Sequence, residues 1–367
     1  MVKDKKKVFV AMSGGVDSSV SAALLQKSGE YDVVGAHMIC WKEDLDIPNF
    51  ECSAEKDAED ARRVADKLGI PFYAMDFTKE YKAAVFDYMV AEYRAGRTPN
   101  PDVLCNKEIK FGLFLKKALS LGAEYIATGH YARKRELKTK NEKLKTFELL
   151  AATDKNKDQS YFLWMLGQEE LRHALFPIGE LQKGEVRELA RKFGLPTAEK
   201  KDSQGLCFVG QVDFAKFLRT LIPAHEGIIQ TSDGKIIGRH DGVEFYTIGQ
   251  RHGLGIGGGT IYYVAKKDFE KNILIVAEGE ADEALYKSEA EIANVNWISG
   301  VAPKLPLACS VRIRYRQPLS NCVIEREASG DNGRLKILFE KLQKGVAAGQ
   351  SAVFYRGEEM LGGGVIA

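Results

Sequence analysis

The chain has 367 residues, of which 45% are hydrophobic and 28% are charged, and its 53 basic and 51 acidic residues give a formal net charge of +2. This length favours two or three domains, and this composition excludes the intrinsically disordered and fibrous classes of protein. The near-neutral charge leaves a nucleic-acid partner open, while six cysteines without any Cys-x-x-Cys pair disfavour a disulfide framework, a zinc ribbon and an iron–sulfur cluster.

The N-terminal segment is basic but leads directly into an apolar run at residues 8–11. It has neither the apolar stretch of a signal peptide nor the Arg- and Ser-rich composition of a transit peptide. No segment approaches the roughly 18 uncharged apolar residues that span a bilayer. We therefore expect a soluble cytoplasmic protein that does not associate with a membrane.

Roughly the first 200 residues alternate short β-branched runs with amphipathic helical stretches. This alternation predicts an α/β domain with a doubly wound, Rossmann-like parallel sheet that is covered by helices on both faces. We expect strands at residues 8–11, 33–38, 72–76 and 125–128, and helices at residues 16–27, 54–68, 79–95, 107–121, 160–166 and 184–193.

Residues 133–145 interrupt this pattern, because they hold seven basic and two acidic residues without a helical or strand period. We expect an exposed excursion between two strands, of which the second covers residues 147–152. Its function is left open.

The pattern changes after residue 196. A loop at 200–210, a helix at 212–221 and strand-length pieces at 228–229, 235–238, 261–265 and 273–276 predict a small β-rich central domain. From about residue 290 no helix is evident, and short strands recur at the spacing of a β-barrel. The predicted domains are residues 1–203 (catalytic α/β domain), 204–284 (central β-rich domain) and 285–367 (C-terminal β-barrel).

The run Ser-Gly-Gly-Val-Asp-Ser-Ser at residues 13–19 lies between the first predicted strand and the first predicted helix. Its small residues let backbone N–H groups approach a phosphate, and the helix N-terminus adds favourable dipole charge. The run is neither a Walker A loop nor a Gly-x-Gly-x-x-Gly fingerprint. An ordinary glycine-rich turn is the alternative, but Asp17 and the two hydroxyls that follow it favour a phosphate site.

A second candidate site is the run Thr-Pro-Asn-Pro-Asp-Val-Leu-Cys-Asn-Lys at residues 98–107. Two prolines stiffen the loop around Asn100, and Asn106 can cap the helix that follows. Cys105 then lies at a helix N-terminus near two lysines, where its thiolate is stabilised, and Asp102 is a candidate proton acceptor. The alternative is a structural cysteine packed behind a proline turn.

A second thiol, Cys207, has glycines on both sides at residues 205 and 210. This arrangement predicts a mobile loop, which a carrier thiol needs because it must meet both a donor and an acceptor. An apolar plug formed by residues 206–209 is the alternative.

Residues 311–316 alternate apolar and basic side chains. A strand there would align Arg312, Arg314 and Arg316 on one face. Such a basic stripe on a small β-domain suits a phosphate backbone, and a solvated strand face is the alternative.

Six motifs occur in one order along the chain: the phosphate loop, Asn-Pro-Asp with its downstream cysteine, Lys-Asp-Gln-Ser at 157–160, Gly-Leu-Cys-Phe-Val-Gly at 205–210, Arg-Tyr-Arg-Gln at 314–317 and Gly-Gln-Ser-Ala-Val at 349–353. The first resembles the loop of the N-type ATP pyrophosphatases, which split ATP to AMP and pyrophosphate to adenylate a substrate. Together the six resemble the tRNA-specific 2-thiouridylase family over essentially the whole chain. The resemblance implies adenylation of C2 of the wobble uridine of tRNA by ATP, then persulfide sulfur transfer that gives 2-thiouridine.

The resemblance also implies roles for single residues. Cys105 would be the nucleophile, with Asp102 beside it, and Cys207 would carry the persulfide, so that transfer leaves a Cys105–Cys207 disulfide. Asp17 would organise Mg²⁺ at the pyrophosphate end of ATP. The implied ATP contacts are Ala11, Met12, Ser13, Gly14, Gly15, Val16, Asp17, Ser18, Met38 and Gly129. The implied tRNA contacts are Asn100, Pro101, Asp102, His130, Lys157, Asp158, Gln159, Arg314, Tyr315 and Gln350.

The implied partners are tRNA and a sulfur donor, either a cysteine desulfurase or a sulfur-relay protein. We expect a monomer, although the sequence leaves the oligomeric state open. The alternatives are another N-type ATP pyrophosphatase, such as an amidotransferase-type synthetase or a ligase, and a non-catalytic RNA-binding protein. The first would leave both cysteine loops unexplained, and the second would need neither thiol. His130 also fits a purely structural histidine, and Cys40, Cys52, Cys309 and Cys322 receive no role.

Overall fold

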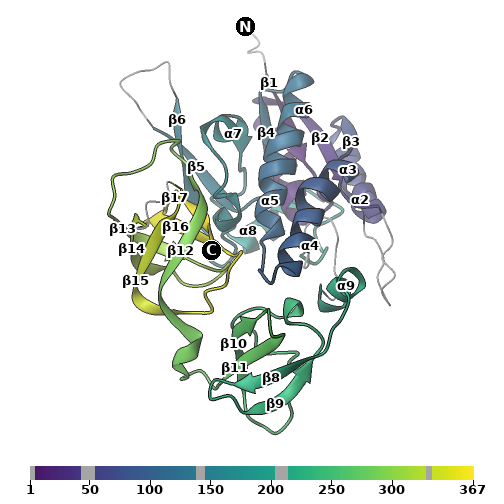
Figure 1. Cartoon of the computed structure of the whole chain (residues 1–367). Helices are drawn as coiled ribbons and strands as arrows, with labels where there is room; N and C mark the ends of the chain where they lie inside the picture. Colours follow the sequence, from purple (N-terminus) through teal and green to yellow (C-terminus); the bar gives the residue numbers. More distant parts are fainter. Residues whose placement is uncertain (1–4, 43–53, 138–144, 203–213, 328–332) are drawn as a thin grey trace.

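The computed structural model describes residues 5–42, 54–137, 145–202, 214–327 and 333–367. Cys207 and its glycine-flanked run lie outside these residues, as does Cys52. The described chain forms an N-terminal α/β domain, a small β-rich domain and a β-barrel (Figure 1). The predicted fold class is therefore confirmed.

The N-terminal domain is built on a five-stranded parallel sheet with the order β3-β2-β1-β4-β7. The four predicted strands are confirmed, and the fifth has only two residues, which is too short for a sequence pattern. The strands are β1 (Lys6–Ala11), β2 (Tyr31–Ile39), β3 (Phe72–Asp76), β4 (Tyr125–Ala127) and β7 (Ala174–Leu175).

Successive strand residues point to opposite faces of this sheet, and each face is buried in an apolar cluster of its own. Val8 and Val10 pack in one apolar cluster with α1 (Val16–Ser28), α2 (Ala54–Leu68) and α8 (Lys183–Lys192). Phe9 and Ala11 pack in the other. That side carries α3 (Thr78–Tyr81), the π-helical η1 (Lys82–Phe86), α4 (Asp87–Arg94), α5 (Pro101–Leu104), the π-helical η2 (Cys105–Phe114) and α6 (Leu115–Ser120). The 3₁₀ turn η3 (Ser160–Leu163) and α7 (Gln168–His173) follow.

The prediction for residues 133–145 is wrong in its first part. Residues 133–137 belong to β5 (Ala132–Leu137), which pairs antiparallel with β6 (Thr146–Ala151); residues 138–144 lie outside the described structure. Two basic residues of this strand have partners far along the chain: Lys134 donates to the carbonyls of Leu171 and Ala174 at 2.8 and 2.6 Å, and Arg133 pairs with Glu358 at 2.6 Å. Long-range pairing of this kind leaves no alternating apolar pattern in the sequence.

The central domain begins with α9 (Phe214–Leu221) and contains a four-stranded sheet with the order β10-β11-β8-β9. The predicted β-rich character is confirmed. Its strands are β8 (Gly227–Thr231), β9 (Ile236–His240), β10 (Tyr262–Asp268) and β11 (Ile273–Glu278), with 3₁₀ turns η4 (Val243–Phe245) and η5 (Glu283–Leu285).

The C-terminal strands follow the order β12-β15-β14-β13-β16-β17, and pairing of β12 with β17 closes them into a barrel. β17 also pairs with β6, so the β5–β6 hairpin of the N-terminal half joins the barrel sheet (Figure 1). None of the helices in the described ranges is long and apolar enough to cross a membrane. The barrel strands are β12 (Tyr286–Trp297), β13 (Leu307–Arg312), β14 (Ser320–Arg326), β15 (Leu335–Lys344), β16 (Ser351–Arg356) and β17 (Glu359–Ile366).

Candidate active site

The phosphate loop joins β1 to α1 at the carboxyl edge of the parallel sheet, where ligands of open α/β sheets bind. Two glycines make its close packing possible. Gly14 has φ +74°, and a Cβ there would lie 2.3 Å from the backbone oxygen of Asp57. A Cβ on Gly129, after β4, would lie 2.7 Å from the backbone nitrogen of Ser18. Any larger residue at either position would displace the loop.

Serine hydroxyls hold the loop in its curved form. The Ser18 hydroxyl accepts from the Ser13 backbone N–H at 3.2 Å and donates to the Gly15 carbonyl at 3.1 Å. Ser19 also donates to the Gly15 carbonyl, at 2.7 Å. A loop fixed in this way at the N-terminus of a 13-residue helix is the kind of site that binds phosphate groups.

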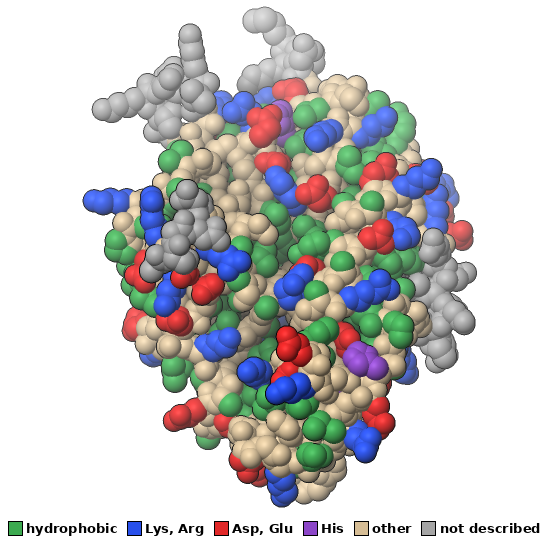
Figure 2. Space-filling view, viewed as in Figure 1, with side chains coloured by type: hydrophobic (Ala, Val, Ile, Leu, Met, Phe, Trp, Pro, Cys, Tyr) green, Lys and Arg blue, Asp and Glu red, His purple; other side chains and the backbone are tan. Residues whose placement is uncertain are grey.

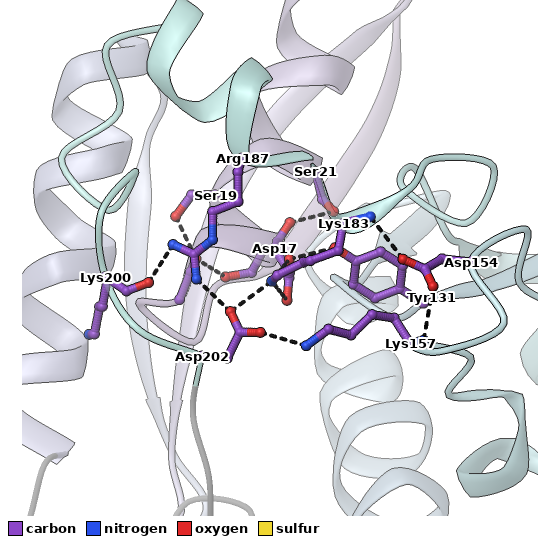
Figure 3. Close-up of polar contacts among 12 residues, drawn as sticks. Asp17, Ser19, Ser21, Tyr131, Asp154, Lys157, Lys183, Arg187, Lys200 and Asp202 are labelled. Atoms are coloured by element: carbon purple, nitrogen blue, oxygen red, sulfur yellow. Dashed lines mark hydrogen bonds and ion pairs between the residues drawn. The ribbon is translucent and has the colours of Figure 1, made fainter. Parts of the chain in front are cut away.

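Asp17 lies at the centre of a polar network (Figure 3). The Tyr131 hydroxyl donates to its carboxylate at 2.9 Å, and the Lys183 ammonium donates to both carboxylate oxygens at 2.7 and 2.9 Å. Lys183 is the first residue of α8, and its backbone N–H donates to Asp154 at 2.9 Å. The sequence analysis missed Lys183, because one lysine at a helix start, 166 residues from Asp17, belongs to no motif.

The same lysine links Asp17 to Asp202, the last described residue before the segment that contains Cys207. Lys183 lies 2.9 Å from Asp202, Lys157 lies 2.6 Å from it, and Arg187 donates to it at 2.6 Å (Figure 3). Burial opposes ionisation of Asp202, but the hydrogen bonds from Lys157 and Lys183 outweigh it and hold its pKa well below the usual range. This network joins the phosphate loop to residue 202.

The predicted ATP residues lie together at this edge of the sheet. Met38 stands near the carboxyl end of β2 and is 4% exposed, while Met12 is 1% and Val16 3% exposed. Their side chains belong to the core, so their contacts with ATP would come mainly from backbone groups. The donor set suits a nucleotide: a curved serine and glycine loop, a carboxylate at Asp17 and a cation at Lys183.

The helix that carries Cys105 begins earlier than predicted. It starts at Pro101, with Asn100 as its N-cap, whose side chain accepts from the Val103 N–H at 3.4 Å. Proline favours the first helical position, because its fixed φ matches the helix and no N–H is lost. Cys105 therefore lies one turn inside the helix, and Asn106, which was predicted as the cap, donates to the Phe162 carbonyl at 3.3 Å instead.

Cys105 is completely buried and is the first residue of the π-helical segment η2. One of the two lysines expected to stabilise its thiolate, Lys107, forms an ion pair with Glu170 at 2.8 Å. Asp102 occupies the first turn of α5 and is half-buried. Because Cys207 lies outside the described residues, the expected Cys105–Cys207 pairing stays a prediction.

The barrel holds the loop that precedes Cys105. The Gln350 amide donates to the carbonyls of Thr98 and Pro99 at 2.8 and 3.3 Å, and the Thr98 N–H donates to the Ala348 carbonyl at 2.9 Å. Gly349 has φ +87°, and a Cβ there would meet the Thr98 backbone at 2.9 Å. Gln350, a predicted tRNA contact, thus positions the Thr98–Pro99 backbone in this structure.

Four other predicted tRNA contacts are also occupied within the chain. Asp158 accepts from the N–H groups of Ala152 and Ser160, each at 3.1 Å, and Gln159 accepts from the Tyr131 N–H at 3.0 Å. Tyr315 packs on Phe162, with ring centroids 4.4 Å apart. The fourth is the buried His130.

His130 is 8% exposed and lies 2.8 Å from the Thr128 hydroxyl. Burial, reinforced by the nearby Lys110, holds its pKa well below the usual value. A neutral histidine packed against Phe111 and Phe176 fits the structural alternative that the sequence left open.

The predicted arginine stripe is wrong. β13 ends at Arg312, and Arg316 has φ +64°, so the three arginines do not share a strand face. Arg312 pairs with the buried Asp158 at 3.1 Å, and Arg314 donates to the carbonyl of Ile248 in the central domain. Arg312 and Arg314 thus bond to acceptors in two different parts of the chain instead of lining one strand face.

Known protein families and relatives match this chain over nearly its whole length. Residues 6–211 match a family model described as the tRNA methyl transferase HUP domain, residues 215–278 a tRNA methyl transferase PRC-barrel domain and residues 287–366 an aminomethyltransferase beta-barrel domain. A tRNA-specific 2-thiouridylase MnmA from Geobacillus thermodenitrificans is 50% identical over 361 residues, covering 98% of this chain and 94% of the relative. The chain belongs to the tRNA-specific 2-thiouridylase family.

A second relative in this 2-thiouridylase family, from Francisella tularensis subsp. novicida, is 47% identical over 368 residues and covers 99% of both chains. Among solved structures, the NH3-dependent NAD synthetase from Campylobacter jejuni is 16% identical, covers 56% of this chain and 72% of its own, and gives a TM-score of 0.31. A TM-score of 0.31 does not establish a common fold.

Proposed function

We propose that this chain is a tRNA 2-thiouridylase that adenylates C2 of the wobble uridine with ATP and then replaces the C2 oxygen by sulfur. One observation carries the proposal: relatives with this name match 98% of the chain at 50% identity. The position of the phosphate loop and Asp17 at the ligand-binding edge of the sheet agrees with it. Another N-type ATP pyrophosphatase would share the loop but would not require similarity across the barrel.

The phosphate loop and its charged neighbours would bind ATP. Serine and glycine backbone groups of residues 11–18 would hold the phosphates, and Met38 and Gly129 would line the adenosine end. Asp17 would bind Mg²⁺, which neutralises charge on the pyrophosphate leaving group. Lys183, whose ammonium lies 2.7 Å from Asp17, would contact the same phosphates.

The two thiols would transfer sulfur in successive reaction steps. Adenylation turns the C2 oxygen into a phosphate ester that can leave as AMP. The terminal sulfur of a Cys207 persulfide then bonds to C2, and the Cys105 thiolate attacks the inner sulfur, so a Cys105–Cys207 disulfide remains. Asp102 would take the thiol proton. An external thiol must reduce the disulfide before the next turnover.

The target uridine would meet Asn100, Pro101 and Asp102, at the start of the Cys105 helix. Because Cys105 is completely buried, the proposal requires tRNA binding to open a path to it. Lys157 and Arg314 would exchange their partners Asp202 and Ile248 for tRNA. Figure 2 shows basic and acidic side chains interspersed on the face in view, which agrees with the net charge of +2.

We further propose that the enzyme works in the cytoplasm, because its substrate is tRNA, and that it works as a monomer. Its sulfur donor would be a cysteine desulfurase or a sulfur-relay protein.

The test is tRNA-dependent AMP formation with purified protein and a tRNA transcript that has uridine at the wobble position. A transcript with cytidine there serves as the control. Asp17→Ala should abolish AMP formation and retain tRNA binding, whereas Asp32→Ala, an exposed aspartate on β2, should have no effect. Normal AMP formation by Asp17→Ala would contradict the assignment of the phosphate loop.

The thiol roles need a second measurement, the content of 2-thiouridine in digested tRNA. Cys105→Ser and Cys207→Ser should each adenylate tRNA and release pyrophosphate but form no 2-thiouridine, because a hydroxyl can form neither the persulfide nor the disulfide. Thiolation at the wild-type rate by both variants would refute the two-thiol mechanism.

A further inference from the structure

Two cysteines that the proposed reaction does not use face each other on the barrel. Cys309 of β13 and Cys322 of β14 are register partners, and their sulfurs lie 3.7 Å apart. Directly opposed residues of antiparallel strands have Cα atoms about 4.5–5.5 Å apart, which lies within the range that a disulfide spans. A bond between these sulfurs would therefore need side-chain rotation rather than a rearrangement of the strands.

The surroundings favour a thiolate at Cys309. Arg356 follows Tyr355, the register partner of Ser310, so Arg356 lies beside Cys309 on the neighbouring strand. A hydrogen bond from Cys322 lowers the pKa of Cys309, and Arg356 lowers it further, against the effect of burial. The same contact, together with burial, raises the pKa of Cys322. Because Arg356 lies beside Cys309 and Cys309 is partly exposed, Cys309 is the thiol that ionises more readily.

A groove gives small molecules access to this pair. Its volume is about 550 Å³, and both cysteines line it together with Ser310, Asn321 and Arg356. Cys309 is partly exposed, while Cys322 is 4% exposed. A partly exposed, activated thiol with a second thiol within reach is the arrangement that redox-sensitive cysteines share.

Metal binding is the competing use of two close thiols. A structural zinc site normally takes four protein ligands. Within the residues that the structure describes, no cluster of three or more His, Cys, Asp or Glu side chains could hold a metal ion. The geometry therefore favours thiol oxidation over metal coordination.

We propose that Cys309 and Cys322 are an oxidation site, which a hydroperoxide converts to an intramolecular disulfide between β13 and β14. The Cys309 thiolate attacks one peroxide oxygen, the O–O bond breaks, and a sulfenic acid and hydroxide (or alkoxide) form. The Cys322 sulfur then bonds to the sulfenic sulfur, and water leaves with the Cys322 proton. Two electrons pass from the thiols to the peroxide, and an added dithiol reverses the reaction.

This site is separate from the proposed catalytic thiols, so it can be tested without any activity assay. The full chain is treated with one equivalent of hydrogen peroxide, alkylated and mapped by peptide mass spectrometry. The expected product is a peptide pair joined through Cys309 and Cys322, which disappears after dithiothreitol treatment. The proposal is overturned if both cysteines remain reduced, and are therefore alkylated, while other cysteines are oxidised. It is also overturned if either one forms a disulfide with a different cysteine.

Three variants test the order of the steps. Cys322→Ser should leave a Cys309 sulfenic acid that dimedone traps, whereas Cys309→Ser should leave Cys322 reduced. Arg356→Gln should raise the pKa of Cys309 and slow disulfide formation. Where this pKa lies above the assay pH, each further unit should slow the reaction about threefold. The effect is smaller than tenfold because the fraction of thiolate falls, while each remaining thiolate is a better nucleophile. Arg326→Gln, an exposed arginine of β14, is the matched control. Equal rates in the two arginine variants would remove Arg356 from the site.

Discussion

Replacement of Lys183 tests the network that joins the phosphate loop to residue 202. Its side chain is 15% exposed, and its ammonium lies 2.7 Å from Asp17 and 2.9 Å from Asp202. Lys183→Met keeps the aliphatic length and removes the charge, which leaves two carboxylates without their shared cation. We expect lower stability and lower ATP-dependent activity in the same variant.

The size of the stability loss follows from burial. Removing one partner of a buried ion pair costs about 3–5 kcal/mol, whereas exposed pairs contribute about 0–1 kcal/mol. Both carboxylate side chains are 31% exposed, and Asp202 keeps Lys157 and Arg187. We therefore expect a loss of about 1–2 kcal/mol at pH 7, or about 2–8 °C in Tm.

The loss should depend on pH in a defined direction. Despite burial, hydrogen bonds from Lys157 and Lys183 lower the pKa of Asp202. A carboxylate of this kind stabilises the fold above its unfolded pKa of about 3.9, and this contribution is lost as the pH falls toward the folded value. The difference between wild type and Lys183→Met should be full at pH 7 and should shrink below about pH 4.

Urea unfolding at pH 7 and pH 3.5, together with tRNA-dependent AMP formation, measures both effects. AMP formation should fall at least about tenfold, which corresponds to about 1.4 kcal/mol of lost transition-state stabilisation. Lys183→Arg should recover part of it. Lys192→Met, an exposed position of the same helix, is the control. If the two Lys→Met variants unfold at the same urea concentration and form AMP equally fast, the reasoning is wrong.

Three further predictions concern the loops around the site. Gly129→Ala should raise the KM for ATP and lower stability by about 1–3 kcal/mol, because its Cβ would meet the phosphate loop, whereas Gly184→Ala in an open helical position should be neutral or stabilising. Gln350→Met should lower kcat for AMP formation with little change in Tm, since it frees the carbonyl of Thr98; an unchanged kcat would contradict a positioning role. Arg314→Gln should weaken tRNA binding and reduce the slope of log affinity against log salt by about 0.7–0.9, and an unchanged slope would show that this arginine only ties the domains together.

The sequence by itself determined the elements whose pattern is local. The buried runs at residues 8–11 and 33–38, and the amphipathic period of residues 54–68, each bury an apolar face, so their periodicity predicts strands and helices directly. The phosphate loop could be found in the same way, because its small residues, its carboxylate and its strand-to-helix context are consecutive. The Asn-Pro-Asp run gave the position of Cys105 but not the start of its helix.

Only the tertiary structure decided which polar groups meet. Lys183 reaches Asp17 across 166 residues, and Gln350 reaches Thr98 across 252 residues, yet neither pair leaves a periodic trace in the sequence. The arginine pattern at 311–316 fails as a strand for the same reason, since Arg312 bonds to Asp158 and Arg314 to the carbonyl of Ile248, two acceptors that lie in different parts of the chain. Burial makes a polar group pair with whichever partner the folded chain brings near, and that partner is set by the packing of distant elements rather than by neighbours in sequence.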